Sequence, residues 1–124
     1  MSTCRHVVLF KFKDATPEAT VQAIEKAFSD LCKELTFVVD FEWGRNNSPE
    51  NLNNGLTHCF LVTFANEEDR DRYLPHPAHI AFVKNYLEDN LESVCVVDYQ
   101  SARLMSPESI GSQEPRADTA RKSP

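Results

Sequence analysis

The strongest constraint on the fold is the stretch at residues 73–82, Tyr-Leu-Pro-His-Pro-Ala-His-Ile-Ala-Phe, which contains two prolines only two positions apart. A proline locks its own φ angle and has no amide proton, so a helix that reaches Tyr73 has to end there. Pro77 suits the first position of a new helix, where the missing donor has no helical partner anyway. The stretch therefore predicts a junction between two helices.

The same junction concentrates groups that exchange protons near neutral pH. Tyr73, His76 and His79 recur every three residues, a spacing that places side chains on one face of a continuous helix, although the prolines interrupt it. An imidazole beside a phenol can move protons and hydrogen-bond a developing enolate. The alternative is that these groups cap and pack the junction, and we favour a capping role for His76.

The N-terminal half of the chain predicts a strand, a helix and a second strand. Residues 4–13 are rich in β-branched and aromatic side chains on both faces, which indicates a strand covered on two sides. Thr16, followed by Pro17 and Glu18, is a helix-start signature with Thr16 as the N-cap. An apolar stripe at helical period follows it, consisting of Val21, Ile24, Phe28, Leu31 and Leu35. Residues 38–44 then alternate as a half-buried strand whose apolar side chains are Val39, Phe41 and Trp43.

The C-terminal half predicts a loop, a strand, two helices and a last strand. Residues 45–55 are mostly turn formers and predict a surface loop of the kind that often borders a site. Residues 56–64 return to a strand in which His58 points with the large apolar set. A short helix capped by Asn66 leads to Tyr73, a second helix follows the prolines, and residues 93–99 form a strongly apolar strand.

The resulting order, β-α-β-β-α-α-β, is the ferredoxin-like or split βαβ arrangement, an α+β fold with an antiparallel four-stranded sheet. Helices cover only one face of such a sheet, yet apolar side chains crowd its surfaces. An uncovered apolar sheet face usually means a partner. We therefore predict a symmetric homodimer whose sheets face each other, which is a dimeric α+β barrel.

Composition and charge argue against several classes of partner. The formal net charge of -6 and the scattered basic residues disfavour nucleic acid and anionic membranes. No apolar run approaches the ~20 residues that a membrane span needs. Because the N-terminus passes directly into a strand pattern rather than a signal peptide, we expect a cytoplasmic protein.

The cysteines, the histidines and the tail complete the expectations from composition. The four cysteines show no C-x-x-C pair and no zinc spacing, so reduced, packed thiols are expected. The histidines lack the paired spacing of a metal site, and we expect neither a metal nor a cofactor. A single domain is predicted at residues 4–101, and residues 105–124 offer so little to bury that a mobile tail is predicted there.

Five ordered motifs resemble those of the stress-responsive A/B barrel family, also called Dabb. They are His-Val-Val-Leu-Phe-Lys-Phe-Lys at 6–13, Phe-Glu-Trp-Gly at 41–44, Gly-Leu-Thr-His-Cys-Phe at 55–60, the 73–82 stretch, and Val-Val-Asp-Tyr at 96–99. The resemblance implies the dimeric α+β barrel. Polyketide cyclases of the olivetolic acid cyclase type in this family close a linear polyketide thioester by aldol condensation, using the tyrosine and a histidine of a Tyr-x-x-His-Pro-x-His motif.

This resemblance implies a set of site residues. The catalytic pair falls on His79, as general base and later proton donor, and on Tyr73, which would hold the thioester carbonyl. His6 and His58 would support the substrate site, and the alternative for both is a satisfied core or interface histidine. Phe28 and Phe82 would line the site; Phe28 stands where those cyclases have a tyrosine.

Two functions are therefore expected from the resemblance. The first is a cofactor-free, lyase-type cyclase that acts on a small apolar or polyketide-like molecule. The alternative is a non-catalytic stress-responsive protein or small-ligand binder whose dimer is the functional unit.

Overall fold

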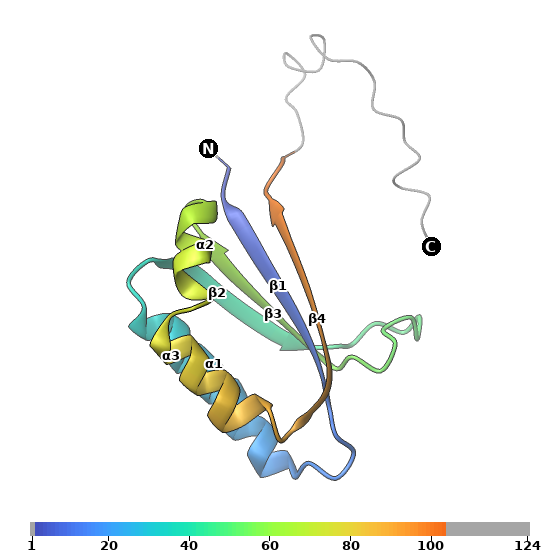
Figure 1. Ribbon diagram of the computed structural model, residues 1–124. Coiled ribbons are helices and arrows are strands. Elements are labelled where there is room, and N and C mark those ends of the chain that lie inside the picture. The colour runs from blue at the N-terminus through green and yellow to red at the C-terminus, as the bar shows by residue number, and fades with distance from the viewer. Residues whose placement is uncertain (1, 104–124) are drawn as a thin grey trace.

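The computed structural model describes residues 2–103, and the tail predicted at 105–124 lies outside that range. The elements follow the predicted order around a single sheet (Figure 1). The strands are β1 (Cys4–Phe12), β2 (Val38–Arg45), β3 (His58–Phe64) and β4 (Leu91–Gln100). The helices are α1 (Glu18–Glu34), α2 (Glu67–Tyr73) and α3 (Pro77–Phe82), and a π-helical turn, η1 (Val83–Leu87), extends α3.

The four strands form one antiparallel sheet in the order β2-β3-β1-β4. This order, with helices α1 and α2–α3 as the two crossovers, is the ferredoxin-like arrangement, so the predicted fold class is confirmed. Residues that pair directly across antiparallel strands point to the same face. The register places His6 of β1 opposite Val62 of β3 and Asp98 of β4, so these three side chains share one face.

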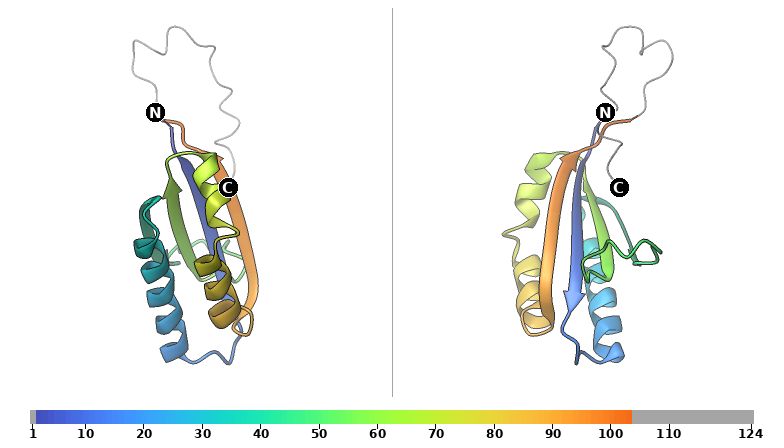
Figure 2. Two further views of the ribbon diagram at one scale, coloured as in Figure 1. Left: turned by 60° about the vertical axis from the view of Figure 1, so that its left-hand side comes forward. Right: turned by 90° about the vertical axis from the view of Figure 1, so that its right-hand side faces the viewer.

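All the helices lie on that face, as the turned views in Figure 2 show. The core between helices and sheet is rich in aromatic rings, and the largest fully buried side chains are Tyr73, Phe10, Phe60, Phe64, Ile24 and Val62. The stripe predicted on α1 is buried at every position, which explains why this helix covers the sheet. Glu25, on the same helix, is a buried carboxylate among these apolar side chains.

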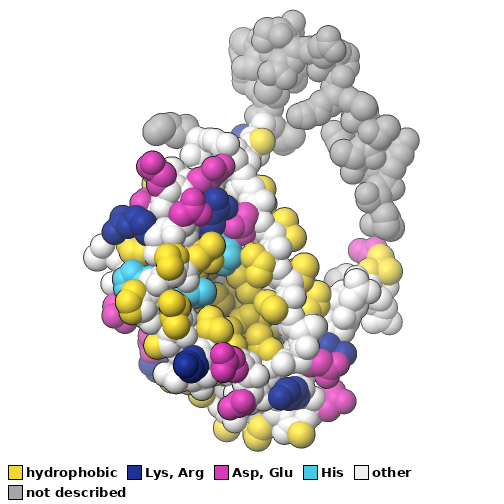
Figure 3. All heavy atoms as spheres, in the orientation of Figure 1, with side chains coloured by type: hydrophobic (Ala, Val, Ile, Leu, Met, Phe, Trp, Pro, Cys, Tyr) yellow, Lys and Arg dark blue, Asp and Glu magenta, His cyan; other side chains and the backbone are white. Residues whose placement is uncertain are grey.

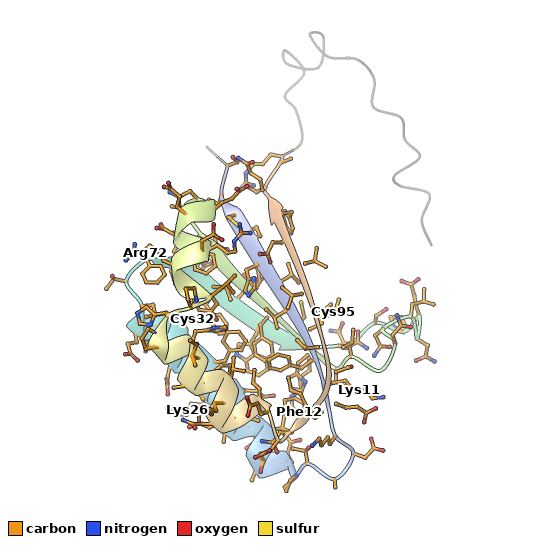
Figure 4. All side chains as sticks on the ribbon, in the orientation of Figure 1. Lys11, Phe12, Lys26, Cys32, Arg72 and Cys95 are labelled. Carbon is orange, nitrogen blue, oxygen red and sulfur yellow. The ribbon has the colours of Figure 1, made fainter. Side chains whose placement is uncertain are left out.

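The opposite face of the sheet carries no helix. It presents Val7 and Leu9 of β1 with their paired neighbours, and Val97, opposite Val7, remains 53% exposed. The loop between β2 and β3 borders a hollow of about 560 Å³ on this face. Cys59 and Cys95, both paired with Leu9, are exposed, and Figure 4 labels Cys95 on β4. The expectation of packed thiols is therefore correct for the buried Cys4 and Cys32 and wrong for these two in the single chain.

Two local predictions are wrong for identifiable reasons. Helix α1 begins at Glu18 with Pro17 as its N-cap, because the Thr16 hydroxyl donates to the Asn90 carbonyl at 3.5 Å instead of capping the helix. In β2 the register slips between Val38 and Asp40, so Val39 is an extra residue and 59% exposed. Val39 therefore does not share the apolar face with Phe41 as the alternation predicted.

Candidate active site

A cavity of about 470 Å³ opens between the α2–α3 junction, η1 and β4. The space-filling view shows it as an apolar hollow with histidine side chains at its edge (Figure 3). Its apolar walls include Val8, Phe10, Phe28, Phe82, Val94 and Val96. Its polar groups are His6, Tyr73, His79, Asp98, Glu88, Glu92 and Ser93. A mostly apolar pocket with a few convergent polar groups is the usual form of a small-molecule site.

The proline junction shapes the floor of this cavity as its sequence predicts. Helix α2 ends at Tyr73, α3 starts at Pro77, and His76 is the N-cap between them. The Ala78 amide donates to Nδ1 of His76 at 3.1 Å, so the capping interpretation of His76 is confirmed.

The cap on Ala78 in turn positions His79. In an uninterrupted helix the Ala78 amide would bond to the Leu74 carbonyl, four residues earlier. Here that carbonyl is free to accept Nδ1–H of His79 at 2.9 Å. A carbonyl can only accept, so the proton sits on Nδ1 and the lone pair of Nε2 is available.

The electrostatics of His79 favour a neutral imidazole. Burial lowers its pKa below the ordinary histidine value, the neighbouring His6 and His76 lower it further, and the bond to the Leu74 carbonyl opposes these effects in part. A neutral imidazole with a free Nε2 at physiological pH is suited to accept a proton.

Tyr73 lies between two imidazoles. Its ring centroid is 4.4 Å from that of His79 and 5.7 Å from that of His6, which meets it edge-on. The residue is fully buried, and among the described residues its hydroxyl has only the Cys32 thiol, a weak hydrogen-bonding group, near it. Burial raises the pKa of Tyr73, and the nearby Cys32 thiol raises it further, so the side chain stays a phenol that can donate.

Cys32, labelled on α1 in Figure 4, is an inert neighbour of this site. Burial raises the pKa of its thiol to about 12, and a protonated thiol is a poor nucleophile. The thiol therefore adds no nucleophile to the imidazoles, the phenol and the carboxylates that line the cavity.

His6 is held by two residues that the sequence analysis missed. Its Nδ1 lies 2.7 Å from Oδ1 of Asp98, and Nη1 of Arg70 donates to the other carboxylate oxygen at 2.9 Å. One signal for Asp98 was present in the sequence, since Val94, Val96 and Asp98 alternate on one strand face and only the last is polar. No local pattern points to Arg70, which reaches the carboxylate from α2.

His58 lies outside the cavity. Its Nε2 is 2.7 Å from the Glu25 carboxylate and its Nδ1 is 2.9 Å from the Thr57 hydroxyl. Nε of Arg45 donates to the same Glu25 carboxylate at 2.8 Å. The structure thus brings Tyr73, His79, His6, Phe28 and Phe82 together around the cavity and places His58 in a separate buried network.

Within residues 2–103, no three histidine, cysteine or acidic side chains come together as a group that could hold a metal ion. In the same range, no helix has the length and apolar character needed to cross a membrane.

Comparison with known proteins settles the family. The sequence model of one protein family, the stress responsive A/B barrel domain, matches residues 4–101. The chain belongs to this family. Two curated relatives each align with 77% of this chain. The stress-response A/B barrel domain-containing protein HS1 of Arabidopsis thaliana is 35% identical, and the alignment covers 87% of its length. The olivetolic acid cyclase of Cannabis sativa is 32% identical, and the alignment covers 93% of its length.

Two solved structures share the fold closely. The crystal structure of At3g17210 from Arabidopsis thaliana superposes with a TM-score of 0.77 at 33% identity, covering 83% of this chain and 99% of that one. The hydroxynitrile lyase of Passiflora edulis superposes with a TM-score of 0.76 over 84% of this chain and 97% of its own. Its sequence identity is only 21%, so this likeness concerns the fold alone.

Proposed function

We propose that this A/B barrel domain is a small, cofactor-free enzyme that performs acid/base chemistry on a carbonyl compound bound in the cavity. The observation that carries the proposal is Tyr73, whose ring packs against the His79 imidazole and whose buried hydroxyl has only the Cys32 thiol, a weak hydrogen-bonding group, near it among the described residues. Buried polar groups are normally paired, so a phenol of a cavity-lining residue that lacks a strong partner is suited to donate to a ligand.

The roles follow from which atoms are free. Nε2 of His79 carries a lone pair and would take a proton from the carbon next to the substrate carbonyl. The Tyr73 phenol would donate to the carbonyl oxygen and stabilise the enolate that forms there. The enolate carbon would then attack a second carbonyl of the same molecule, which is an intramolecular aldol reaction of the polyketide cyclase kind.

The cavity favours a neutral substrate with an apolar body. Among the described residues that line it, the ionisable groups are histidine, tyrosine and carboxylates such as Glu88 and Glu92, with no lysine or arginine. A carboxylate or phosphate on the substrate would find no cation there. The likeness to the olivetolic acid cyclase supports a polyketide-like ketone or thioester as the class to test first.

Substitution of His79 tests this proposal. Binding of a panel of aromatic polyketide-like ketones and thioesters is followed by ligand-detected NMR, with turnover recorded in the same tube for wild type and His79→Ala. We expect binding by both proteins and turnover by wild type only. Equal turnover by the two proteins would refute the role of His79.

A second candidate is a non-catalytic small-ligand binder, which the predominance of apolar side chains around the cavity favours. Native mass spectrometry separates the two. A ligand retained without conversion, with the same mass before and after prolonged incubation, supports binding alone.

We also infer that the chain acts as a homodimer through its uncovered sheet face. Similar ferredoxin-like proteins, such as one from Thermobifida fusca, are described as dimeric. A charge on that face should separate the subunits, so Val97→Glu is expected to sediment as a monomer where wild type sediments as a dimer. The matched control is Ile80→Glu on α3, equally exposed at 51% but on the helix side. A monomeric wild type at micromolar concentration would contradict the inference.

A further inference from the structure

The proposed reaction leaves one arrangement in the cavity unused, the link from His6 through Asp98 to Arg70. His6 is buried, lines the cavity and meets Tyr73 edge-on at a ring distance of 5.7 Å. The sheet register sets Asp98 directly opposite His6 across β1 and β4, which brings a carboxylate to Nδ1 without any special loop.

The carboxylate is held at both oxygens. Oδ1 lies 2.7 Å from Nδ1 of His6, and Oδ2 accepts from Nη1 of Arg70 at 2.9 Å. These two contacts fix the orientation of the Asp98 side chain, because its rotation would break both. A carboxylate only accepts hydrogen bonds, so in a neutral His6 imidazole the proton sits on Nδ1 and the lone pair stays on Nε2.

His6 and His79 therefore have the same tautomer for different reasons. A backbone carbonyl fixes His79, and a carboxylate fixes His6. The difference matters when a proton arrives on Nε2. A carboxylate stabilises the imidazolium that forms, whereas a neutral carbonyl does so far less.

We propose that Asp98, oriented by Arg70, is a positioning residue that makes His6 a second proton-accepting group of the cavity, in contact with Tyr73 as His79 is. This inference rests on the proposed acid/base function. His79 takes the first proton from the carbon next to the carbonyl and returns it to the alkoxide that the aldol addition forms. His6 would then take the second proton of that carbon on Nε2, where the Asp98 carboxylate stabilises it, and Nε2–H would give it to the new hydroxyl as that group leaves as water. No other reactant is needed, since both protons come from the substrate and are returned to its own oxygen.

The tautomer of His6 is the first test, and it needs no substrate. Nitrogen-15 NMR of the histidine side chains distinguishes a protonated from an unprotonated ring nitrogen. In wild type at neutral pH we expect Nδ1 of His6 to be protonated and Nε2 unprotonated. The opposite tautomer, or an equal mixture, would overturn the proposal whether or not the protein turns over any substrate.

Asp98→Asn is the second test. The side-chain amide can donate to Nδ1 and so favours the tautomer with the proton on Nε2, which removes the lone pair from the cavity. We expect the NMR signature of His6 to invert and kcat to fall by about 10²–10⁴-fold with KM little changed. The matched control is Asp71→Asn, which removes the other carboxylate on Arg70, 2.9 Å from its Nε, without touching His6. That control should keep both the wild-type tautomer and wild-type turnover.

The outcomes separate this proposal from the proposed function. Turnover that depends on His79 but is unchanged in Asp98→Asn would leave the enzyme assignment standing and remove His6 from it. The protein could instead show the expected tautomer but bind a ligand without converting it. That result would refute the enzyme assignment and, with it, the proton-accepting role of His6, while the His6–Asp98 geometry would remain correct.

Discussion

Removing the Tyr73 hydroxyl should make the protein more stable while impairing the site. Tyr73 is fully buried, and its hydroxyl has no partner among the described residues apart from the nearby thiol of Cys32, which is a weak hydrogen-bonding group. An unsatisfied buried polar group costs about 1–3 kcal/mol. Tyr73→Phe keeps the ring and its contacts with His79, so most of this cost should be recovered.

We expect the free energy of unfolding of Tyr73→Phe to rise by about 1–2 kcal/mol, allowing for loss of the weak thiol contact. For a domain of this size each kcal/mol corresponds to roughly 4–8 °C in Tm. Urea unfolding followed by far-UV circular dichroism measures the change, and calorimetry checks the shift in Tm.

Tyr86→Phe is the matched control. Tyr86 is 37% exposed, so removal of its hydroxyl should change stability by less than about 0.5 kcal/mol. Loss of about 1 kcal/mol or more in Tyr73→Phe would refute the reasoning, because it would mean that the hydroxyl is satisfied inside the folded protein and is not reserved for a ligand.

Three further predictions concern the junction, the titration of His79 and the buried network. His76→Ala removes the cap on Ala78 and should lower the free energy of unfolding in urea by about 1 kcal/mol. His76→Asn should restore the cap and most of that stability. Equal stability of the two variants would refute the capping role. Burial lowers the pKa of His79 in the folded protein, so the unfolded chain binds a proton on this residue first as the pH falls. The free energy of unfolding of wild type, relative to that of His79→Gln, should therefore decrease below pH 6.5, about the ordinary pKa of histidine. A difference that stays constant with pH would contradict this. Glu25→Ala leaves His58 and Arg45 without their shared carboxylate and should lower the free energy of unfolding by about 2 kcal/mol. Glu18→Ala removes an exposed carboxylate from the same arginine and should cost less. An equal loss of stability in both variants would show that burial of the carboxylate is irrelevant.

Most of the fold could be predicted because it depends on local patterns. The alternation in residues 4–13, the stripe on α1 and the cap at Asn66 each act over a few neighbouring residues and appear where the sequence predicts them. The bulge at Val39 could not be predicted, because it depends on how β2 aligns with β3. The π-helical turn at Val83–Leu87 has no local signal that we recognise.

The site was predictable where its residues are neighbours in the chain. Tyr73, His76 and His79 lie within one short stretch, and the motif resemblance pointed to His6. Asp98 and Arg70 act through contacts between β1, β4 and α2, which only the sheet register reveals. For His58, the resemblance suggested a contact with the substrate, whereas the structure places its Nε2 against the Glu25 carboxylate, outside the cavity.

The most direct test of the central claim is exchange of the α-protons of a neutral, apolar methyl ketone in deuterated buffer, followed by proton NMR. The assay isolates proton removal from carbon, so it does not require the natural substrate to be known. We predict that wild type accelerates exchange over buffer and that His79→Gln, which still binds the ketone, does not. Exchange at the buffer rate with wild type, under conditions where the ketone is seen to bind, would contradict the assignment of this cavity as an acid/base site.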